Sequence, residues 1–169
     1  MVVLETSEGP IQLALDHDSA PETAANFEQY VRDGFYDGVI FHRVISNFMI
    51  QAGGFGPDME PRKPREAIRN EADNGRSNKR GTVAMARTMS PHSAASQFFI
   101  NVNDNGFLDH SGKTQDGWGY CVFADVVEGM DVVDRIRETD TTARAGHRDV
   151  PVKEIRIERA YLTGEQEPQ

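Results

Sequence analysis

The chain has 169 residues, of which 38% are hydrophobic and 27% are charged, and its formal net charge is −9 at pH 7. This length is enough for one domain with a sizeable apolar core, and the composition is that of a soluble globular protein. The negative charge argues against a general affinity for nucleic acid or for an anionic membrane surface.

The ends of the chain and its single cysteine add further limits. The first residues lack the basic and apolar regions of a signal peptide, and no apolar run is long enough to cross a bilayer, so we expect a cytoplasmic protein. Residues 1–163 are expected to form one domain and residues 164–169 a flexible tail. One cysteine excludes an internal disulfide framework, and Cys121 is predicted to be a small buried hydrophobe.

A β-hairpin and a helix are predicted at the start of the chain. Apolar residues alternate along residues 2–15 around a turn-like Ser-Glu-Gly-Pro sequence, which predicts the hairpin. Ser19 and Glu22 have the spacing of a capping box and predict that a helix begins there. Apolar residues then repeat at helical spacing, and Gly34 is suited to end the helix.

Residues 41–55 are predicted to form two short strands joined by a turn. Phe41, Arg43 and Ile45 have period-two spacing, so we expect their side chains to share one face of the first strand. A guanidinium on an apolar face needs an ion-pair partner or a function. The residues that follow favour a pocket with one cationic donor over an arginine paired with an acid at the rim of a sheet; they are Phe48, Met49 and Gln51.

The next segments alternate between loops and strands. Residues 57–64 contain three prolines and should form a loop, because proline cannot donate to a β-ladder. The basic residues at positions 76–80 are interpreted as a solvated loop. Strands are predicted over residues 82–87 and 96–102, and in the second one the two faces differ. Its predicted core face carries Phe98, Ile100 and Val102, and its predicted pocket face carries Gln97, Phe99 and Asn101.

The remaining third completes the predicted fold. Residues 103–119 form a long loop of a kind that is usually functional. A buried strand at residues 120–126, a short helix, a polar loop and a last strand at residues 153–162 follow. Many short strands with two short helices predict a mainly β fold, most economically a closed barrel with helical caps.

Other chemistries leave weaker signals. His92, Ser93 and Asp104 could assemble a hydrolase triad, but no nucleophile-elbow pattern surrounds the serine. The five histidines show no ligand spacing for zinc, so neither a metal nor a cofactor is expected. His42 is predicted to be a hydrogen-bonded core histidine rather than a base.

Three motifs follow one another along the chain. They are Phe-His-Arg-Val-Ile-x-x-Phe-Met-x-Gln from residue 41, Gly-Thr-Val-Ala-Met-Ala-Arg from residue 81 and Ser-Gln-Phe-Phe-Ile from residue 96. Together they resemble the cyclophilin family of peptidyl-prolyl cis-trans isomerases over essentially the whole chain. The segment Trp-Gly-Tyr-Cys-Val-Phe from residue 118 is most similar to the short bacterial cytoplasmic members. The resemblance implies a closed eight-stranded antiparallel β-barrel capped by two α-helices.

The resemblance also implies roles for individual residues. Arg43 matches the family's catalytic arginine. The wall of the proline pocket is matched by Phe48, Met49, Phe99 and Leu108. Gln51 and Gln97 match the polar groups that position the substrate backbone, and Ala86 with Arg87 matches the strand along which the peptide lies.

Three of the expected substrate-binding residues depart from the family's vertebrate-type members. Those members have tryptophan, histidine and asparagine at the positions of Phe107, Tyr120 and Arg87. Because a phenylalanine ring has no indole N–H, we expect only weak binding of cyclosporin-type inhibitors.

The implied activity is isomerisation of X-Pro bonds in peptides and in unfolded or folding proteins, without a covalent step. In this mechanism the arginine hydrogen-bonds the prolyl nitrogen while the bond is twisted. We expect a monomer. The alternative is a proline-recognition module or chaperone in which catalysis is incidental.

Overall fold

The computed structural model describes residues 1–163, so the predicted tail at residues 164–169 lies outside the described residues. The strands are β1 (Val2–Thr6), β2 (Gly9–Leu15), β3 (Phe41–Ile45), β4 (Met49–Ala52), β5 (Phe55–Gly56), β6 (Glu60–Pro61), β7 (Thr82–Met85), β8 (Phe98–Asn101), β9 (Val122–Glu128), β10 (Thr141–Arg144), β11 (His147–Pro151) and β12 (Ile157–Leu162). The helices are α1 (Pro21–Arg32) and α2 (Met130–Arg137), with 3-10 turns η1 (Pro57–Met59), η2 (Ala72–Asn74) and η3 (Gly106–Leu108). None of the described helices is both long and apolar enough to span a membrane.

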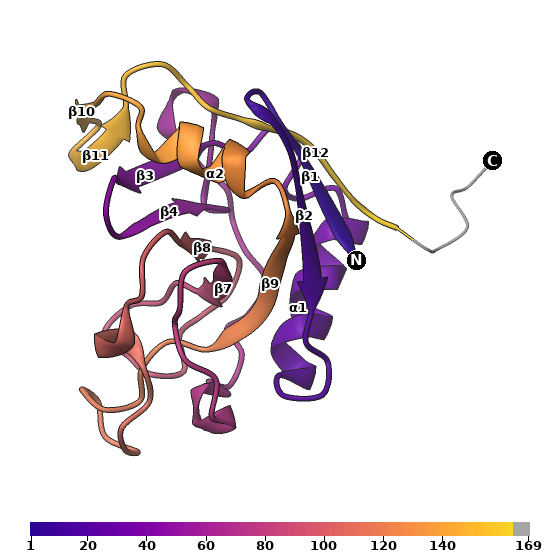
Figure 1. Cartoon of the computed structure of the whole chain (residues 1–169), viewed down its shortest axis with the longest axis vertical. Helices are drawn as coiled ribbons and strands as arrows, with labels where there is room; N and C mark the ends of the chain where they lie inside the picture. Colours follow the sequence, from indigo (N-terminus) through magenta and orange to yellow (C-terminus); the bar gives the residue numbers. More distant parts are fainter. Residues whose placement is uncertain (164–169) are drawn as a thin grey trace.

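Eight strands form one curved antiparallel sheet in the order β12-β1-β2-β9-β7-β8-β4-β3 (Figure 1). The predicted opening hairpin and the two predicted strands within residues 41–55 are confirmed as parts of this sheet. The prediction of a closed barrel is wrong. The sheet is an open half-barrel, because its outermost strands, β12 and β3, do not pair with each other.

The two edges of the sheet approach each other at one point, an isolated bridge between Ile40 and Arg156. Beside the bridge, the Phe41 N–H donates to the Ile155 carbonyl at 2.9 Å and the Ile157 N–H donates to the Val39 carbonyl at 2.8 Å. For the pairing to continue in antiparallel register, β3 would have to pair with the residues before β12, and β12 with the residues before β3. Those residues form turns, bends and irregular backbone, so no ladder forms and the two edge strands stay unpaired.

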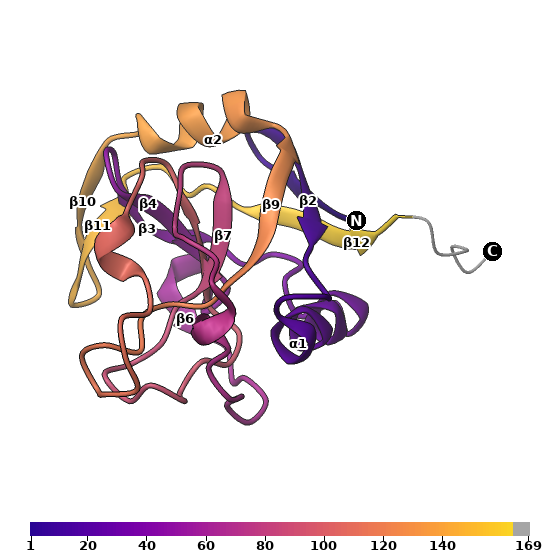
Figure 2. The ribbon, with the colours of Figure 1, turned by 60° about the horizontal axis from the view of Figure 1, so that its bottom comes forward.

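The two helices cover opposite ends of the curved sheet (Figure 2). On α1, the Phe27 ring lies 5.1 to 5.2 Å from the rings of Tyr36, Phe98 and Phe123, measured between centroids. On α2, Val132, Val133 and Ile136 are buried in the same apolar cluster. The helical caps and the predicted core face of β8 are therefore confirmed.

The N-terminus of α1 differs from the prediction. The N-cap residue is Ala20 and no side chain of the helix caps it, so the capping box predicted for Ser19 and Glu22 does not form. Instead the Thr23 N–H donates to the buried carboxylate of Glu71 at 2.7 Å. A residue far along the chain thus supplies the acceptor that the first turn of the helix needs.

The C-terminus of α1 agrees with the prediction. Gly34 follows the helix with φ +70°, a value that favours glycine. Its N–H donates to the Val31 carbonyl, and the Phe35 N–H reaches back to the Tyr30 carbonyl at 3.0 Å. These two bonds form a Schellman motif, which ends the helix at the predicted glycine.

Two short hairpins lie in segments that were predicted to be loops. In the first, Phe55 of β5 pairs with Pro61 of β6, which proline permits at the end of a short edge strand. In the second, β10 and β11 turn through Ala145 and Gly146, whose φ angles are 51° and 79°. β6, β10 and the first half of β11 are mostly exposed, so these segments lack the apolar alternation by which a strand is recognised.

A β-bulge in β3 changes the predicted orientation of its side chains. Phe41 pairs with Ala52 and Arg43 with Gln51, so the register shifts by one residue at His42. As a result Phe41 points into the core, whereas Arg43 is exposed on the outer surface. The prediction that Phe41 and Arg43 share a face is wrong, because the extra residue of a bulge reorients the side chains around it.

Candidate active site

A second apolar cluster lies on the outer surface of the sheet, separate from the core. Its buried members are Met49, Ala84, Phe99, Leu108 and Val122, and Ile45, Phe48, Ala86 and Tyr120 pack against it. Strand alternation explains its position, because Phe99 points outward while its neighbours Phe98 and Ile100 point into the core. The pocket face predicted for residues 96–102 therefore exists, although its Asn101 is buried in hydrogen bonds instead of lining a cavity.

The loop at residues 103–119 brings Leu108 to this cluster on the turn η3. Asn105, just before the turn, donates through Nδ2 to the Phe48 carbonyl at 2.9 Å and to Asn101 Oδ1 at 2.8 Å. These bonds fix η3 against β4 and β8. The long loop predicted to be functional is thus held rigidly where it meets the cluster.

A cavity of about 270 Å³ opens above the cluster. Nine of the eleven expected site residues line it: Arg43, Phe48, Met49, Gln51, Ala86, Arg87, Phe99, Leu108 and Tyr120. They come from β3, β4 and the turn between them, from β8 and η3, and from the segments after β7 and before β9. The structure therefore gathers side chains that are up to 77 residues apart in the chain.

Arg43 stands at the polar edge of this cavity. Its Nη1 donates to Gln51 Oε1 at 3.4 Å, and Gln51 Nε2 donates in turn to Gln97 Oε1 at 2.9 Å. Among the described residues no carboxylate lies within 4.0 Å of the Arg43 guanidinium. The site thus presents an uncompensated cationic donor beside apolar walls.

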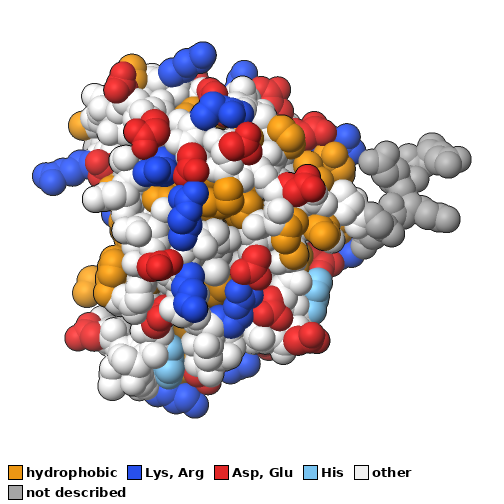
Figure 3. Space-filling view, viewed as in Figure 1, with side chains coloured by type: hydrophobic (Ala, Val, Ile, Leu, Met, Phe, Trp, Pro, Cys, Tyr) orange, Lys and Arg blue, Asp and Glu red, His pale blue; other side chains and the backbone are white. Residues whose placement is uncertain are grey.

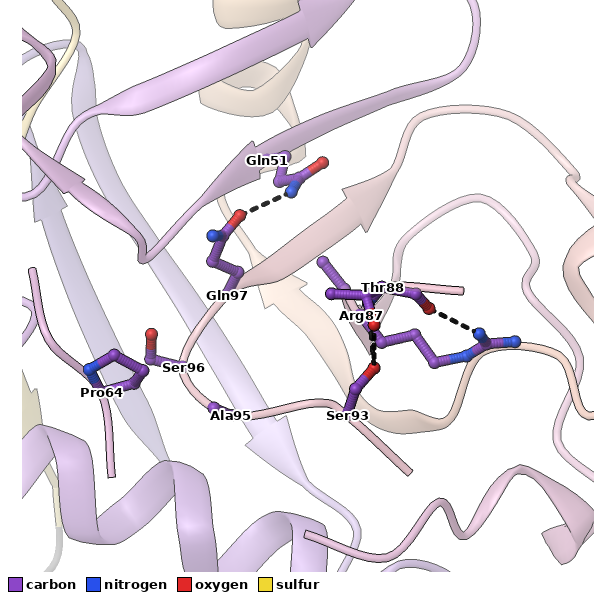
Figure 4. A pocket seen from close by; sticks show the side chains of 9 residues that line it. Gln51, Pro64, Arg87, Thr88, Ser93, Ala95, Ser96 and Gln97 are labelled. Carbon is purple, nitrogen blue, oxygen red and sulfur yellow. Dashed lines mark hydrogen bonds between the residues drawn. The ribbon is translucent and has the colours of Figure 1, made fainter. Parts of the chain in front are cut away.

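A second cavity of about 230 Å³ shares Gln51, Ala86 and Arg87 with the first. Figure 4 shows the side chains that line this second cavity. Gln97, the tenth expected residue, lines only this second cavity. The sequence predicted no substrate-binding role for the rest of its lining, which is Pro64, Thr88, Ser93, Ala95 and Ser96. The only sequence signal for these residues is a run of small and polar residues immediately before Gln97.

Arg87 lies between the two cavities, and three neutral groups hold it. Its Nε donates to the Gly119 carbonyl at 3.1 Å and its Nη1 to the Thr88 carbonyl at 2.8 Å. Its Cζ lies 4.6 Å from the centroid of the Tyr120 ring, a cation–π contact. The side chain is therefore oriented without any loss of its positive charge.

Phe107, the eleventh expected residue, lines neither cavity. Its side chain is 76% exposed, and its ring centroid lies 5.6 Å from that of Phe48 at the rim of the first cavity. An exposed aromatic ring in this place can contact a ligand only outside the pocket proper.

The hydrolase interpretation is wrong on geometry. His92 Nδ1 accepts the Asn70 N–H at 3.0 Å, while Ser93 Oγ donates to the Ser90 carbonyl at 2.6 Å. Asp104 accepts from the Arg80 N–H instead of contacting either residue. Among residues 1–163 no group of three or more His, Cys, Asp or Glu side chains is placed to hold a metal ion.

Two titratable residues near the site are buried. The Cys121 side chain is 4% exposed and its burial raises the thiol pKa to about 11, which confirms a small buried hydrophobe. His42 is also buried, and burial, with smaller effects of His147 and Arg43, lowers its pKa to about 4. The prediction of a hydrogen-bonded core histidine is only half right, because His42 Nδ1 has no hydrogen-bond partner among the described residues.

Comparisons with known proteins find relatives that match over nearly the whole chain. The family model for cyclophilin type peptidyl-prolyl cis-trans isomerase/CLD matches residues 1–162. Peptidyl-prolyl cis-trans isomerase cyp18 of Streptomyces antibioticus is 58% identical over 163 residues, which cover 96% of this chain and 98% of that protein. Peptidyl-prolyl cis-trans isomerase B of Escherichia coli K12 is 56% identical over 158 residues, or 94% of this chain and 96% of that protein.

A solved structure shares the fold. The crystal structure of a Cryptosporidium parvum cyclophilin type peptidyl-prolyl cis-trans isomerase, obtained in the presence of the dipeptide Ala-Pro, matches with a TM-score of 0.80 at 23% sequence identity. The match covers 97% of this chain and 99% of that chain.

Proposed function

We propose that Arg43 is the catalytic residue of this chain, which belongs to the cyclophilin-type peptidyl-prolyl cis-trans isomerases. These enzymes isomerise X-Pro bonds, and proline-containing peptides are the substrates of this chain. The observation that carries this proposal is the Arg43 guanidinium, which lies beside an apolar cavity with no carboxylate near it among the described residues. Apart from the 3.4 Å bond from Nη1 to Gln51 Oε1, its N–H donors are therefore left for a substrate.

The reaction needs no covalent step. Amide resonance sets the barrier to X-Pro rotation at about 18–20 kcal/mol, and unaided rotation takes tens to hundreds of seconds. When the bond twists, resonance is lost and the prolyl nitrogen regains a lone pair. A donor aimed at that lone pair stabilises the twisted state more than either planar state, and this difference lowers the barrier.

The remaining site residues suit the other tasks of such a mechanism. Phe48, Met49, Phe99 and Leu108 offer apolar walls that would hold the prolyl ring still while the rest of the chain rotates. Gln51 and Gln97 are fixed by their mutual hydrogen bond and would position the substrate backbone. Ala86 and Arg87 would lie alongside the peptide. A bound peptide would displace water from around the exposed Arg43 guanidinium, which would strengthen its electrostatic effect.

The magnitude of the arginine's contribution can be bounded. A rate increase of about a millionfold corresponds to roughly 8 kcal/mol of transition-state stabilisation. Removal of one well-placed donor typically costs about 10²- to 10³-fold in rate. Arg43 would thus supply up to half of the effect, and the positioning of the ring by the apolar walls would supply much of the rest.

Several expectations about partners stay predictions. We propose unfolded and folding proteins as substrates alongside short peptides, a monomeric state, one domain over residues 1–163 and a cytoplasmic location. Weak binding of cyclosporin-type inhibitors is supported by Phe107, which is exposed at the rim and carries no N–H donor. A chaperone role independent of catalysis is not required by any feature of the site.

The test is an Arg43→Ala variant assayed on a short X-Pro peptide. We expect kcat/KM to fall about 10²- to 10³-fold, while the dissociation constant of a proline-containing peptide changes by less than about tenfold. This pattern separates an arginine that acts on the twisted bond from one that only binds substrate. Equal loss of binding and of turnover would contradict the proposed role.

Arg135 provides a matched control. It lies on α2, lines neither cavity and donates through Nη2 to the Glu8 carbonyl at 2.7 Å. Arg135→Ala removes the same functional group from a surface helix and should leave kcat/KM within about twofold of the wild type. A comparable loss in both variants would show that net charge, not the donor at position 43, governs the rate.

A further inference from the structure

The lining of the two cavities differs in charge from the rest of the chain. The protein has 27 Asp and Glu residues against 18 Lys and Arg. The residues that line the two cavities nevertheless include Arg43 and Arg87 and neither Asp nor Glu. The substrate site is therefore a cationic area on an acidic protein.

Arginines elsewhere on the protein are commonly neutralised by nearby acids. Arg76 contacts Asp16 and Asp125 at 3.1 and 2.7 Å, and Arg80 contacts Asp134 at 2.8 Å. Figure 3 shows the same mixing on one face of the molecule, where basic and acidic side chains are interspersed. Arg87 differs, since its described partners are two backbone carbonyls and an aromatic ring.

The position of Arg87 determines which part of a substrate it meets. In the proposed mechanism the prolyl ring occupies the apolar cavity and its nitrogen faces Arg43. Arg43 is hydrogen-bonded to Gln51, which lines both cavities. Gln51 is in turn hydrogen-bonded to Gln97, which lines the second cavity, so the second cavity lies on the Arg43 side of the apolar cavity. The residue attached to the prolyl nitrogen therefore extends toward the second cavity, where Arg87 stands at the boundary.

We propose that Arg87 is a specificity-determining residue that favours substrates with a carboxylate on the residue preceding the proline. This inference rests on the proposed function of Arg43 and its pocket. A Glu or Asp side chain at that position meets a fixed, uncompensated guanidinium, whereas a Lys or Arg side chain meets a like charge. The two contacts with carbonyls keep the guanidinium in place, so little side-chain entropy is lost when a carboxylate arrives.

The expected preference for a carboxylate before the proline is moderate and depends on the salt concentration. Exposed ion pairs are worth up to about fivefold in an equilibrium or rate constant, and screening weakens them as the Debye length shortens. We expect kcat/KM for a Glu-Pro peptide to exceed that for the otherwise identical Gln-Pro peptide about threefold at low ionic strength. A Lys-Pro peptide should be slower than the Gln-Pro peptide by a similar factor, and all three should converge at about 0.5 M salt.

Variants of Arg87 test the assignment through ratios measured within one protein. Arg87→Gln should bring the Glu-Pro to Gln-Pro ratio close to one, and Arg87→Glu should reverse the order of the Glu-Pro and Lys-Pro peptides. Arg87→Lys keeps the charge and should retain most of the preference. Because each ratio is taken within one variant, a general loss of activity or stability cancels.

Arg135→Gln is the matched control, since it makes the same change in net charge outside both cavities and should leave the ratio unchanged. Equal rates for the Glu-Pro and Gln-Pro peptides in the wild type would overturn the inference. So would a preference that survives in Arg87→Gln or that disappears equally in Arg135→Gln. Failure of the proposed function has a different signature, because Arg43→Ala would then isomerise the neutral Gln-Pro peptide as fast as the wild type.

Discussion

The Glu71 carboxylate accepts two hydrogen bonds from Thr23, one from its backbone N–H and one from its hydroxyl, both at 2.7 Å. Thr23 lies in the first turn of α1, and Glu71 lies 48 residues later, just before η2. Glu71 is 4% exposed. A buried carboxylate from outside the helix thus satisfies an N–H that the helix itself leaves without a partner.

We expect Glu71→Ala to lower the free energy of unfolding by about 2–3 kcal/mol, because a charged hydrogen bond and a helix cap are lost together. Glu71→Gln keeps an acceptor and should cost about half as much. Ser19→Ala is the control, since Ser19 does not cap α1, and it should cost about 0.5 kcal/mol or less. Urea unfolding measures the free energy of unfolding of all three variants. A larger loss of stability in Ser19→Ala than in Glu71→Ala would indicate that Ser19, and not Glu71, caps the helix.

Gly53 supports the site by allowing β4 to approach the residues before β8. Its φ is +100°, and a Cβ there would lie 2.6 Å from the Ser96 carbonyl oxygen. Ser96 Oγ also donates to the Gly53 carbonyl at 2.8 Å, next to Gln97. Gly53→Ala should therefore cost about 2–3 kcal/mol, from backbone strain and from the displaced Ser96 backbone.

Gly75 separates these two causes. Its φ is +80°, but no atom lies within 4 Å of a Cβ placed there. Gly75→Ala should cost only about 1 kcal/mol, the strain alone. Thermal unfolding compares the stability of the two variants. Equal losses of stability would show that the close approach to Ser96 adds no further free-energy cost. Gly53→Ala should also lower kcat/KM, because the shift reaches the Gln51–Gln97 pair.

His42 makes stability depend on pH. Its pKa is about 4 in the folded protein, below the usual 6.5, so the unfolded chain binds a proton more readily between these values. Stability from this residue is complete above about pH 6.5 and is lost as the pH falls toward 4. The loss reaches about 3 kcal/mol, since one pKa unit corresponds to about 1.4 kcal/mol.

A His42→Gln variant checks this dependence, because glutamine does not titrate. The free energy of unfolding should fall less steeply between about pH 6.5 and pH 4 in the variant than in the wild type. Carboxylates contribute to both proteins alike, so the difference between the two curves isolates His42. Parallel curves would mean that His42 has the same pKa in the folded and the unfolded chain, which would contradict the prediction.

Cys121 should be inert in the folded protein. Its thiol is buried, its pKa is about 11, and Thr23 Oγ1 lies 3.6 Å from its Sγ. Because the thiolate is the reactive form, a thiol reagent at neutral pH should label Cys121 only when the chain opens. Labelling followed over added urea should track unfolding; rapid labelling of the native protein would contradict the burial.

Local patterns in the sequence determined much of the fold. The alternation in residues 96–102 placed Phe98 and Ile100 in the core and Phe99 outside it. Gly34 marked the end of α1, because a positive φ at that position depends on one residue and its neighbours. The motifs that begin at residues 41, 81 and 96 also indicated the family correctly. These features need only short-range chemistry or side chains at regular spacing.

Contacts between distant residues decided the rest. The bulge at His42 that turns Arg43 outward depends on pairing with β4, and the cap on α1 depends on Glu71. The second cavity and the open edge between β12 and β3 likewise arise from segments that meet only in the folded chain. Sequence spacing determines which side chains can share a face, but strand register and remote hydrogen bonds determine which of them do, since both depend on the energy of the whole fold.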